Sequence, residues 1–263
     1  MKARKIVLTS GKGGVGKTTT TANLGATLAK RGQRVILIDA DIGLRNLDLV
    51  LGLEKRIVFD LVEVAEGRCQ LRQALIKDKR FESLSILPAA QTREKEAISA
   101  AQFSAIVELA AEQADYVLID CPAGIETGFR NAVAGASEAI VVTTPEVSAI
   151  RDADRVVGKI AAEGKPIRLI VNRLRPEMVR SGDMLSVEDV CEVLAVELLG
   201  VVPDDEEVID TTNRGEPIVL NDSSRLGAIY DKIARRLEGE IVPFTNFDGQ
   251  GFFGRLIDAL KAG

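Results

Sequence analysis

The chain has 263 residues, of which 46% are hydrophobic and 28% are charged, a composition typical of a globular protein with a sizeable core. It has no histidine, which excludes Ser-His and Cys-His nucleophilic pairs, histidine general bases and histidine-ligated metals. The net charge of −5 disfavours general nucleic-acid binding, and three scattered cysteines, expected to be buried and inert, indicate a reducing cytoplasm.

Short apolar, β-branched runs alternate with helix-like stretches along the chain. The predicted strands span residues 5–9, 34–39, 84–87, 116–120, 139–143, 167–171 and 198–202, and the predicted helices span 17–30, 97–113, 125–134, 148–162, 187–194 and 224–237. Several strands are apolar nearly throughout, as is typical of strands covered on both faces. The alternation predicts one α/β domain over residues 1–240, with a doubly wound, mostly parallel sheet. No apolar run is long enough for a signal peptide or a membrane span.

A glycine-rich loop joins the first predicted strand to the first predicted helix. Its glycines let successive backbone amides turn toward a phosphate, and the helix adds its positive end. Lys17 is expected to reach the β- and γ-phosphates, and the Thr18 hydroxyl is expected to bind Mg²⁺. The loop fits the pattern G-x-x-x-x-G-K-[ST] and reads Gly11-Lys12-Gly13-Gly14-Val15-Gly16-Lys17-Thr18-Thr19.

A second lysine, Lys12, lies at the tip of this loop, where it cannot easily reach the γ-phosphate of its own site. Across a dimer interface it could neutralise transition-state charge in the partner's site, as an arginine finger does. The segment 12–18 resembles the deviant Walker A loop of the ParA/MinD family of ATPases. The resemblance implies a P-loop fold, ATP as the nucleotide, an ATP-dependent homodimer and a catalytic role in trans for Lys12, beside that of Lys17.

The predicted strand 34–39 ends in two nearby carboxylates, Asp39 and Asp41. Carboxylates at the carboxyl end of a parallel strand point into the ligand crevice. Without histidine, a carboxylate is the natural group to position the attacking water, so we assign that catalytic role to Asp41 and indirect support of Mg²⁺ to Asp39. The alternative is that they only cap the following turn. The resemblance makes Asp41 the aspartate of switch I, the first of two nucleotide-sensing loops.

The predicted strand 116–120 ends in Asp120 and continues into Pro122 and Gly124. This is a Walker B arrangement, in which Asp120 holds Mg²⁺ directly or through water. Pro122 and Gly124 begin a second loop that could sense the γ-phosphate. A capping aspartate after a strand is the alternative.

Two later strand ends are candidates for the adenine site. An asparagine such as Asn172 can pair with an adenine edge through its donor and its acceptor. The resemblance implies that Asn172 lines the adenine site together with Pro203, Asp204 and Asp205. From the residues alone, either segment could equally be a turn.

The C-terminal residues predict a flexible connector, 241–251, rich in Gly, Asn, Asp and Pro, and then a short amphipathic helix, 252–263. Its apolar face, within an arc of about 140°, contains Phe252, Phe253, Leu256, Ile257 and Leu260. One hypothesis is that this helix packs on the core of the domain. The resemblance implies instead that it targets the protein to an anionic membrane surface. This tail is less basic than the family pattern. One tail should therefore bind weakly, and two tails on an ATP-bound dimer more tightly.

The segment 146–155 begins a predicted helix, and its mixed charges are typical of a solvated face. The resemblance implies that Ser148, Arg151 and Asp154 lie where the division inhibitor MinC and the activator MinE compete. It therefore implies a Mg²⁺-dependent ATPase that regulates division spatially, is cytoplasmic, and attaches to the inner face of the membrane when ATP-bound.

Three other classes of protein remain as alternatives. A ParA-type DNA-segregation ATPase is disfavoured by the acidic net charge and the amphipathic tail. An ATPase similar to the nitrogenase iron protein needs a pair of suitably placed cysteines to ligate a metal cluster. Cys121, which directly follows Asp120, does not look like such a ligand. In a non-hydrolysing scaffold, Asp41 and Lys12 would be incidental.

Overall fold

The structure, a computed structural model, describes residues 2–94, 97–245 and 247. Within these residues, eight strands form one sheet in the order β3-β4-β2-β5-β1-β6-β7-β8. All neighbouring strands are parallel except β3, which is antiparallel to β4. The strands are β1 (Arg4–Thr9), β2 (Val35–Asp39), β3 (Ile76–Lys77), β4 (Leu84–Leu87), β5 (Tyr116–Asp120), β6 (Glu138–Thr143), β7 (Ile167–Leu174) and β8 (Glu197–Pro203). The predicted fold class is confirmed.

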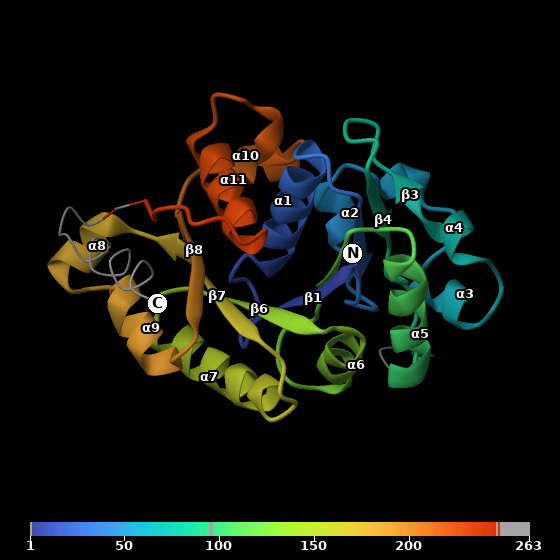
Figure 1. The fold of residues 1–263 in the computed structure, drawn as a ribbon, viewed down its shortest axis with the longest axis horizontal. Coiled ribbons are helices and arrows are strands. Elements are labelled where there is room, and N and C mark those ends of the chain that lie inside the picture. Colours follow the sequence, from blue (N-terminus) through green and yellow to red (C-terminus); the bar gives the residue numbers. More distant parts are fainter. Residues whose placement is uncertain (1, 95–96, 246, 248–263) are drawn as a thin grey trace.

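Helices cover both faces of the sheet (Figure 1), as a doubly wound fold requires. One layer contains α1, α2, α10 and α11, and the opposite layer contains α5, α6, α7 and α9. The helices are α1 (Lys17–Lys30), α2 (Leu47–Val50), α3 (Leu61–Ala65), α4 (Leu71–Ala74), α5 (Ala100–Ala111), α6 (Thr127–Gly135), α7 (Val147–Ala161), α8 (Pro176–Ser181), α9 (Val187–Leu194), α10 (Glu207–Asn213) and α11 (Arg225–Leu237), with 3-10 turns η1 (Glu54–Arg56) and η3 (Ile218–Leu220).

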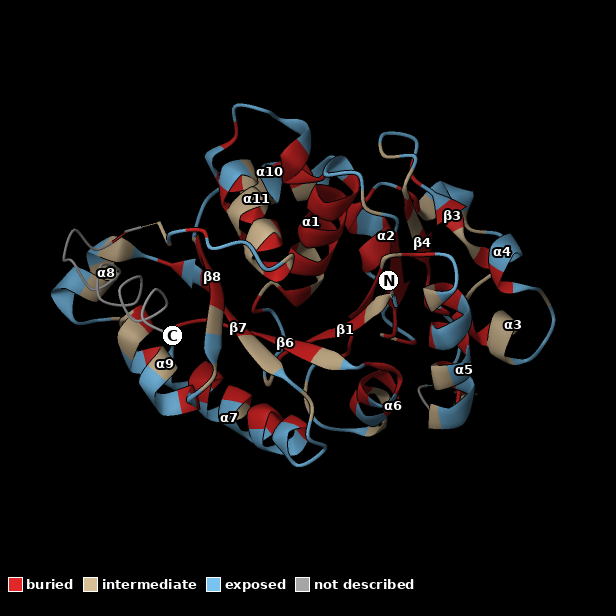
Figure 2. Ribbon diagram, in the orientation of Figure 1, coloured by how far each residue is buried: buried red, intermediate tan, exposed pale blue. Residues whose placement is uncertain are grey.

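The core lies on both faces of the central strands. Every residue of β2 and β5 is buried, which explains why these strands are apolar nearly throughout instead of alternating. Figure 2 shows buried residues concentrated in the sheet and on the inward faces of the helices. Because the core is mainly aliphatic, it accommodates few aromatic side chains, such as Phe103, Phe129 and Tyr230.

Local signals account for the differences from the predicted boundaries. The helix expected at 97–113 begins at Ala100, because Ser99 is its N-cap and forms a capping box with Gln102 in the first turn. The strand expected at 198–202 extends to Glu197–Pro203 and contains a register shift against β7. The elements absent from the prediction, such as β3, α2, α3 and α4, are too short to show a periodicity.

The cysteine prediction is partly wrong. Cys121 is buried, but Cys69 and Cys191 are only half-buried. Burial nevertheless raises the pKa of Cys121 to about 12 and that of Cys191 to about 11, so both remain protonated thiols at neutral pH.

The described part of the chain contains no helix with both the length and the apolar character needed to cross a membrane. The predicted amphipathic helix, with Phe252, Phe253, Leu256, Ile257 and Leu260, lies outside the described residues.

Candidate functional site

The phosphate loop lies between β1 and α1, as predicted. Gly14 and Gly16 have φ of 79° and 89°, in the left-handed region that favours glycine. Gly16 is the N-cap residue of α1, so no cap side chain competes for the first helix amides, which is the arrangement that anions bind. A Cβ on Gly16 would come within 2.2 Å of the Asn172 side-chain nitrogen. The loop backbone is therefore tightly constrained.

Lys17 and Asp120 form a buried ion pair at the centre of the site. The Lys17 Nζ donates to Asp120 Oδ1 at 2.8 Å, and the Thr21 hydroxyl donates to the same oxygen at 3.2 Å. Burial alone would lower the pKa of Lys17, but the carboxylate of Asp120 more than offsets it and the pKa is raised. Thr21 was not among the predicted residues, although its spacing of four from Lys17 on α1 was a signal for it.

Asp39 lies next to Asp120 on the neighbouring strand, since the two residues are register partners of β2 and β5. Its carboxylate accepts backbone N–H groups from Asp41, Asn46 and Leu47 at 2.9–3.1 Å. Burial, and then the charge of Asp120, raise the pKa of Asp39 to about 7. The two carboxylates thus repel each other, and a cation placed between them would relieve that repulsion.

This set of residues fits a magnesium ion. The described residues contain no cluster of three or more acidic or thiol groups that could hold a metal unaided. Mg²⁺ does not require one, because it is usually bound by one or two carboxylates together with substrate phosphates and water. Thr18, half-buried in the first turn of α1, and the carboxylates of Asp39 and Asp120 match that requirement.

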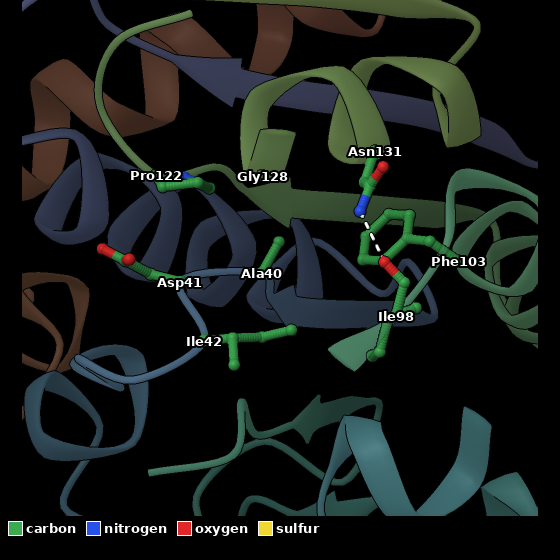
Figure 3. Close-up of a pocket in the computed structure, with 8 residues that line it drawn as sticks. All are labelled: Ala40, Asp41, Ile42, Ile98, Phe103, Pro122, Gly128 and Asn131. Carbon is green, nitrogen blue, oxygen red and sulfur yellow. Dashed lines mark hydrogen bonds between the residues drawn. The ribbon is translucent and has the colours of Figure 1, made fainter. Parts of the chain in front are cut away.

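The loops after β2 and β5 lie close together (Figure 3). Ala40, Asp41 and Ile42 line a small pocket with Pro122, and the Asp41 carboxylate points away from the side lined by Phe103 and Asn131. The Ala40 amide donates to the Asp120 carbonyl, and the Gly124 amide donates to the Ser10 carbonyl. The first predicted nucleotide-sensing loop is therefore bonded to the end of β5, and the second is bonded to Ser10, directly before the phosphate loop.

Lys12 is half-exposed and lies against the start of α7. Its Nζ donates to the Ser148 hydroxyl at 3.2 Å and is 3.7 Å from a Glu146 carboxylate oxygen. Ser148, Arg151 and Asp154 are exposed and follow a three-residue spacing, so they share one stripe of α7. This stripe is accessible, and one of its members contacts the phosphate loop.

The predicted adenine residues lie at the ends of β7 and β8, but they differ in their contacts. The Asn172 side-chain nitrogen donates to the Val15 carbonyl at 2.7 Å, so in this structure it braces the phosphate loop. Asp204 accepts from Arg175 at 2.7 Å, and Asp205 accepts the Glu207 amide at the start of α10. Pro203 is the last residue of β8. A groove beside these strand ends is lined by, among others, Pro145, Val147, Arg173, Arg175, Met178 and Asp204.

Known proteins resemble this chain over nearly its whole length. Residues 6–218 match the CobQ/CobB/MinD/ParA nucleotide binding domain. The septum site-determining protein MinD of Synechocystis sp. is 60% identical over 247 residues, 93% of this chain and 92% of that protein. The MinC:MinD cell division protein complex of Aquifex aeolicus has a TM-score of 0.86 at 50% identity and covers 93% of this chain and 99% of its own. MinD complexed with Mg-ADP from Pyrococcus horikoshii has a TM-score of 0.82 at 33% identity, covering 90% and 96%.

The parallel sheet, the phosphate loop and the buried Lys17–Asp120 pair define a P-loop nucleotide-binding protein of an ATPase family. The 60% identity to a MinD protein over 93% of the chain identifies the family within this class. The chain belongs to the MinD family of septum site-determining proteins, which act in cell division.

Proposed function

We propose that the chain is a Mg²⁺-dependent ATPase that works as a spatial switch in cell division. ATP binding closes a homodimer, and the paired C-terminal helices then attach it to an anionic membrane. The dimer recruits MinC, and hydrolysis stimulated by MinE returns the protein to the cytoplasm. The observation that carries the proposal is the buried cluster of Lys17, Asp120 and Asp39 beneath the phosphate loop, in a chain of the MinD family.

The residues divide the chemistry among them. The amides of 11–19 and Lys17 would bind the β- and γ-phosphates, and Thr18, Asp39 and Asp120 would hold Mg²⁺, which supplies charge neutralisation when bound. Asp41 would orient water for attack on the γ-phosphorus, breaking the bond to the bridging oxygen and releasing ADP and phosphate. Lys12 would leave Glu146 and Ser148 and neutralise charge in the partner's site. Asn172 and the segment Pro203–Asp205 would line the adenine site, beside the groove that Asp204 borders.

Two substitutions test the hydrolytic step. Asp41→Ala and Lys12→Ala should each lower ATP turnover, measured with vesicles and activator, by about 100-fold while nucleotide still binds. Lys159→Ala, an exposed lysine on α7, is the matched control and should keep the wild-type rate. Wild-type turnover in both Asp41→Ala and Lys12→Ala would leave a non-hydrolysing scaffold as the better description.

Co-sedimentation with anionic vesicles tests the membrane step. Binding should require ATP, be lost with ADP, and be lost when residues 252–263 are deleted. Joint replacement of Phe252 and Phe253 by Ser should have the same effect, whereas Asp258→Ala on the polar side should not. Binding that is independent of nucleotide or survives the deletion would contradict the proposal, and ATP-dependent binding to DNA instead would favour a ParA-type segregation ATPase.

A further inference from the structure

Arg236, in the last turn of α11, holds the chain that follows this helix. Its guanidinium donates to the carbonyls of Val242 at 2.9 Å, Pro243 at 2.8 Å and Leu199 at 3.1 Å, and it lies 4.0 Å from the centre of the Phe244 ring. Burial and the neighbouring Arg235 lower the pKa of Arg236 to about 10, which leaves it charged at neutral pH. Arg236 is half-buried, so its hydrogen bonds to three carbonyls and its contact with the Phe244 ring compensate for the water that its charge loses.

The Leu199 carbonyl lies at an irregularity in β8, the edge strand of the sheet. Leu198 pairs with Leu169, and Gly200 pairs with Ile170, so Leu199 is the extra residue of a bulge. Its carbonyl accepts from Arg236. Arg236 therefore links three separate pieces of backbone: the edge strand, α11 and the segment after it.

This segment, residues 242–245 and 247, is called the strap. It runs back along α11, because its contacts fall in reverse order: Phe244 with Arg236, the Thr245 hydroxyl with Lys232 at 3.1 Å, and Phe247 with Arg225 at 5.9 Å. Val242 and Phe247 are buried. Figure 1 draws the strap in red directly after α11. Part of the predicted connector 241–251 is thus attached to the domain.

The strap leads the chain from the amino ends of the sheet strands back toward their carboxyl ends. The carbonyl of Leu237, the last residue of α11, accepts from Arg4 at the start of β1. At the opposite end of α11, the Ser224 hydroxyl donates to Glu207 on α10, which follows the carboxyl end of β8. Since the nucleotide site lies at the carboxyl ends of the strands, the strap returns the chain toward the side of the sheet that carries the site.

We infer that Arg236 is a positioning residue for membrane attachment: by holding the strap on α11, it leaves only positions 248–251 of the predicted connector 241–251 after the strap, and it brings the chain at Phe247 to the nucleotide side. The inference rests on the proposed function of the tail. Effective concentration falls roughly as the −3/2 power of linker length, so releasing the strap should lower it about fourfold for the second tail of a dimer.

The test compares full-length variants with the wild type. Arg236→Met keeps the apolar stem but loses all donors. It should bring at least tenfold faster chymotrypsin cleavage after Phe244 and Phe247 and about fourfold weaker ATP-dependent binding to anionic vesicles, with nucleotide affinity unchanged. Arg235→Met is the matched control, because Arg235 pairs with Glu240 at the surface, and it should match the wild type in both assays. If Arg236→Met does not fold, insertion of seven Gly and Ser residues between Asp248 and Gly249 lengthens the connector with the strap in place and should also weaken vesicle binding about fourfold.

The outcomes separate the two ideas. Unchanged cleavage in Arg236→Met, or wild-type vesicle binding in both Arg236→Met and the insertion variant, overturns the role of the strap while the membrane proposal stands. If the wild type itself binds no vesicles with ATP, the proposed function fails, and the strap inference fails with it.

Discussion

Lys17 and Asp120 neutralise each other in a buried site where either charge alone would destabilise the fold. Both side chains are almost completely buried, and Asp39 adds a second carboxylate beside Asp120. Removing one partner of a buried ion pair leaves an uncompensated charge, and this costs more than the pair contributes. The lysine expected to bind phosphate is therefore also part of the packing of the site.

A double-substitution cycle distinguishes these two roles of Lys17. Lys17→Met should lower the free energy of unfolding by about 3–5 kcal/mol, because Asp120 is left unpaired. Adding Asp120→Asn should recover most of the lost stability. It should not recover nucleotide binding, which stays at least about 100-fold weaker. Urea denaturation and nucleotide titration measure the two quantities. An additive cycle would mean that the pair is not coupled.

At the scale of elements, the phosphate loop and α7 approach so closely that only glycine fits between them. A Cβ on Gly11 would lie 2.1 Å from the Asp152 carbonyl carbon of α7, whereas a Cβ on Gly13 would meet nothing within 4 Å. α7 also supplies Glu146 and Ser148 to Lys12 at its start. A shift of α7 should therefore change the conformation of the phosphate loop, and a change in the loop should shift α7.

Two alanine substitutions in this loop should therefore have very different effects on the stability of the protein. Gly11→Ala should cost about 2–4 kcal/mol of stability, because backbone atoms must move, and Gly13→Ala should stay within about 0.5 kcal/mol. Thermal and urea denaturation of both variants provide the comparison. Equal stabilities would show that the loop and α7 separate easily.

Arg80 joins three elements on the other side of the molecule. It pairs with the buried carboxylate of Asp78 at 2.6 Å and donates to the carbonyls of Leu51, after α2, and Gly215, after α10. Burial alone would raise the pKa of Asp78, but the hydrogen bonds and charge of Arg80 outweigh it and the pKa is lowered. Arg80 thus braces the segment after the first nucleotide-sensing loop against the segment after β8.

The lowered pKa of Asp78 sets a direction for the effect of pH. A carboxyl group whose pKa is lower in the folded than in the unfolded state stabilises the fold above its ordinary pKa of about 4, and this contribution disappears as the pH falls through the folded value. Asp78→Asn should lower the free energy of unfolding by about 1–3 kcal/mol at pH 7. The difference from the wild type should shrink below about pH 4. Denaturant titrations at pH 7, 4 and 3 measure it, and a constant difference would contradict this account.

At the scale of the whole molecule, three exposed apolar side chains lie in the segments that follow strands of the nucleotide site, and together they are called the apolar rim. Leu44 follows β2, Ile125 follows β5 and Val147 follows β6, with exposed fractions of 63%, 40% and 65%. The carboxyl ends of parallel strands meet at one edge of the sheet, so these residues share one side of the molecule. An apolar rim around a polar site fits a second copy of the chain.

A charge on this rim should prevent the proposed homodimer from forming. Leu44→Glu should abolish the ATP-dependent increase in mass measured by light scattering and leave the stability of the monomer unchanged, because the residue is already exposed. Leu109→Glu is the control, since Leu109 is 46% exposed on α5, away from this edge. A dimer that forms normally with Leu44→Glu would place the interface elsewhere.

Most of the domain and the centre of the site could be predicted, because their signals are local. Apolar strands, amphipathic helices and a phosphate loop appear as short patterns, and the Asp39–Asp120 proximity follows from strand ends meeting at one edge. The contact of Asn172 with Val15 joins residues 157 positions apart, so no local pattern could indicate it. The strap was predicted to be part of a flexible connector because the segment 241–251 is rich in Gly, Asn, Asp and Pro. The bond from Arg236 to the carbonyl at the β8 bulge joins residues 37 positions apart, and no local pattern reveals it.

The central place of β1 has a consequence for synthesis of the chain. Leu8 is the register partner of Asp120, and Thr9 is the register partner of Val141, so the first strand acquires its neighbours only after more than a hundred further residues. Contacts so distant in sequence slow folding, and incomplete chains expose apolar strands. A nascent chain that ends before β6 therefore contains the whole phosphate loop but lacks α7 and Asn172, which pack against it. The nucleotide site should accordingly form late during synthesis on the ribosome.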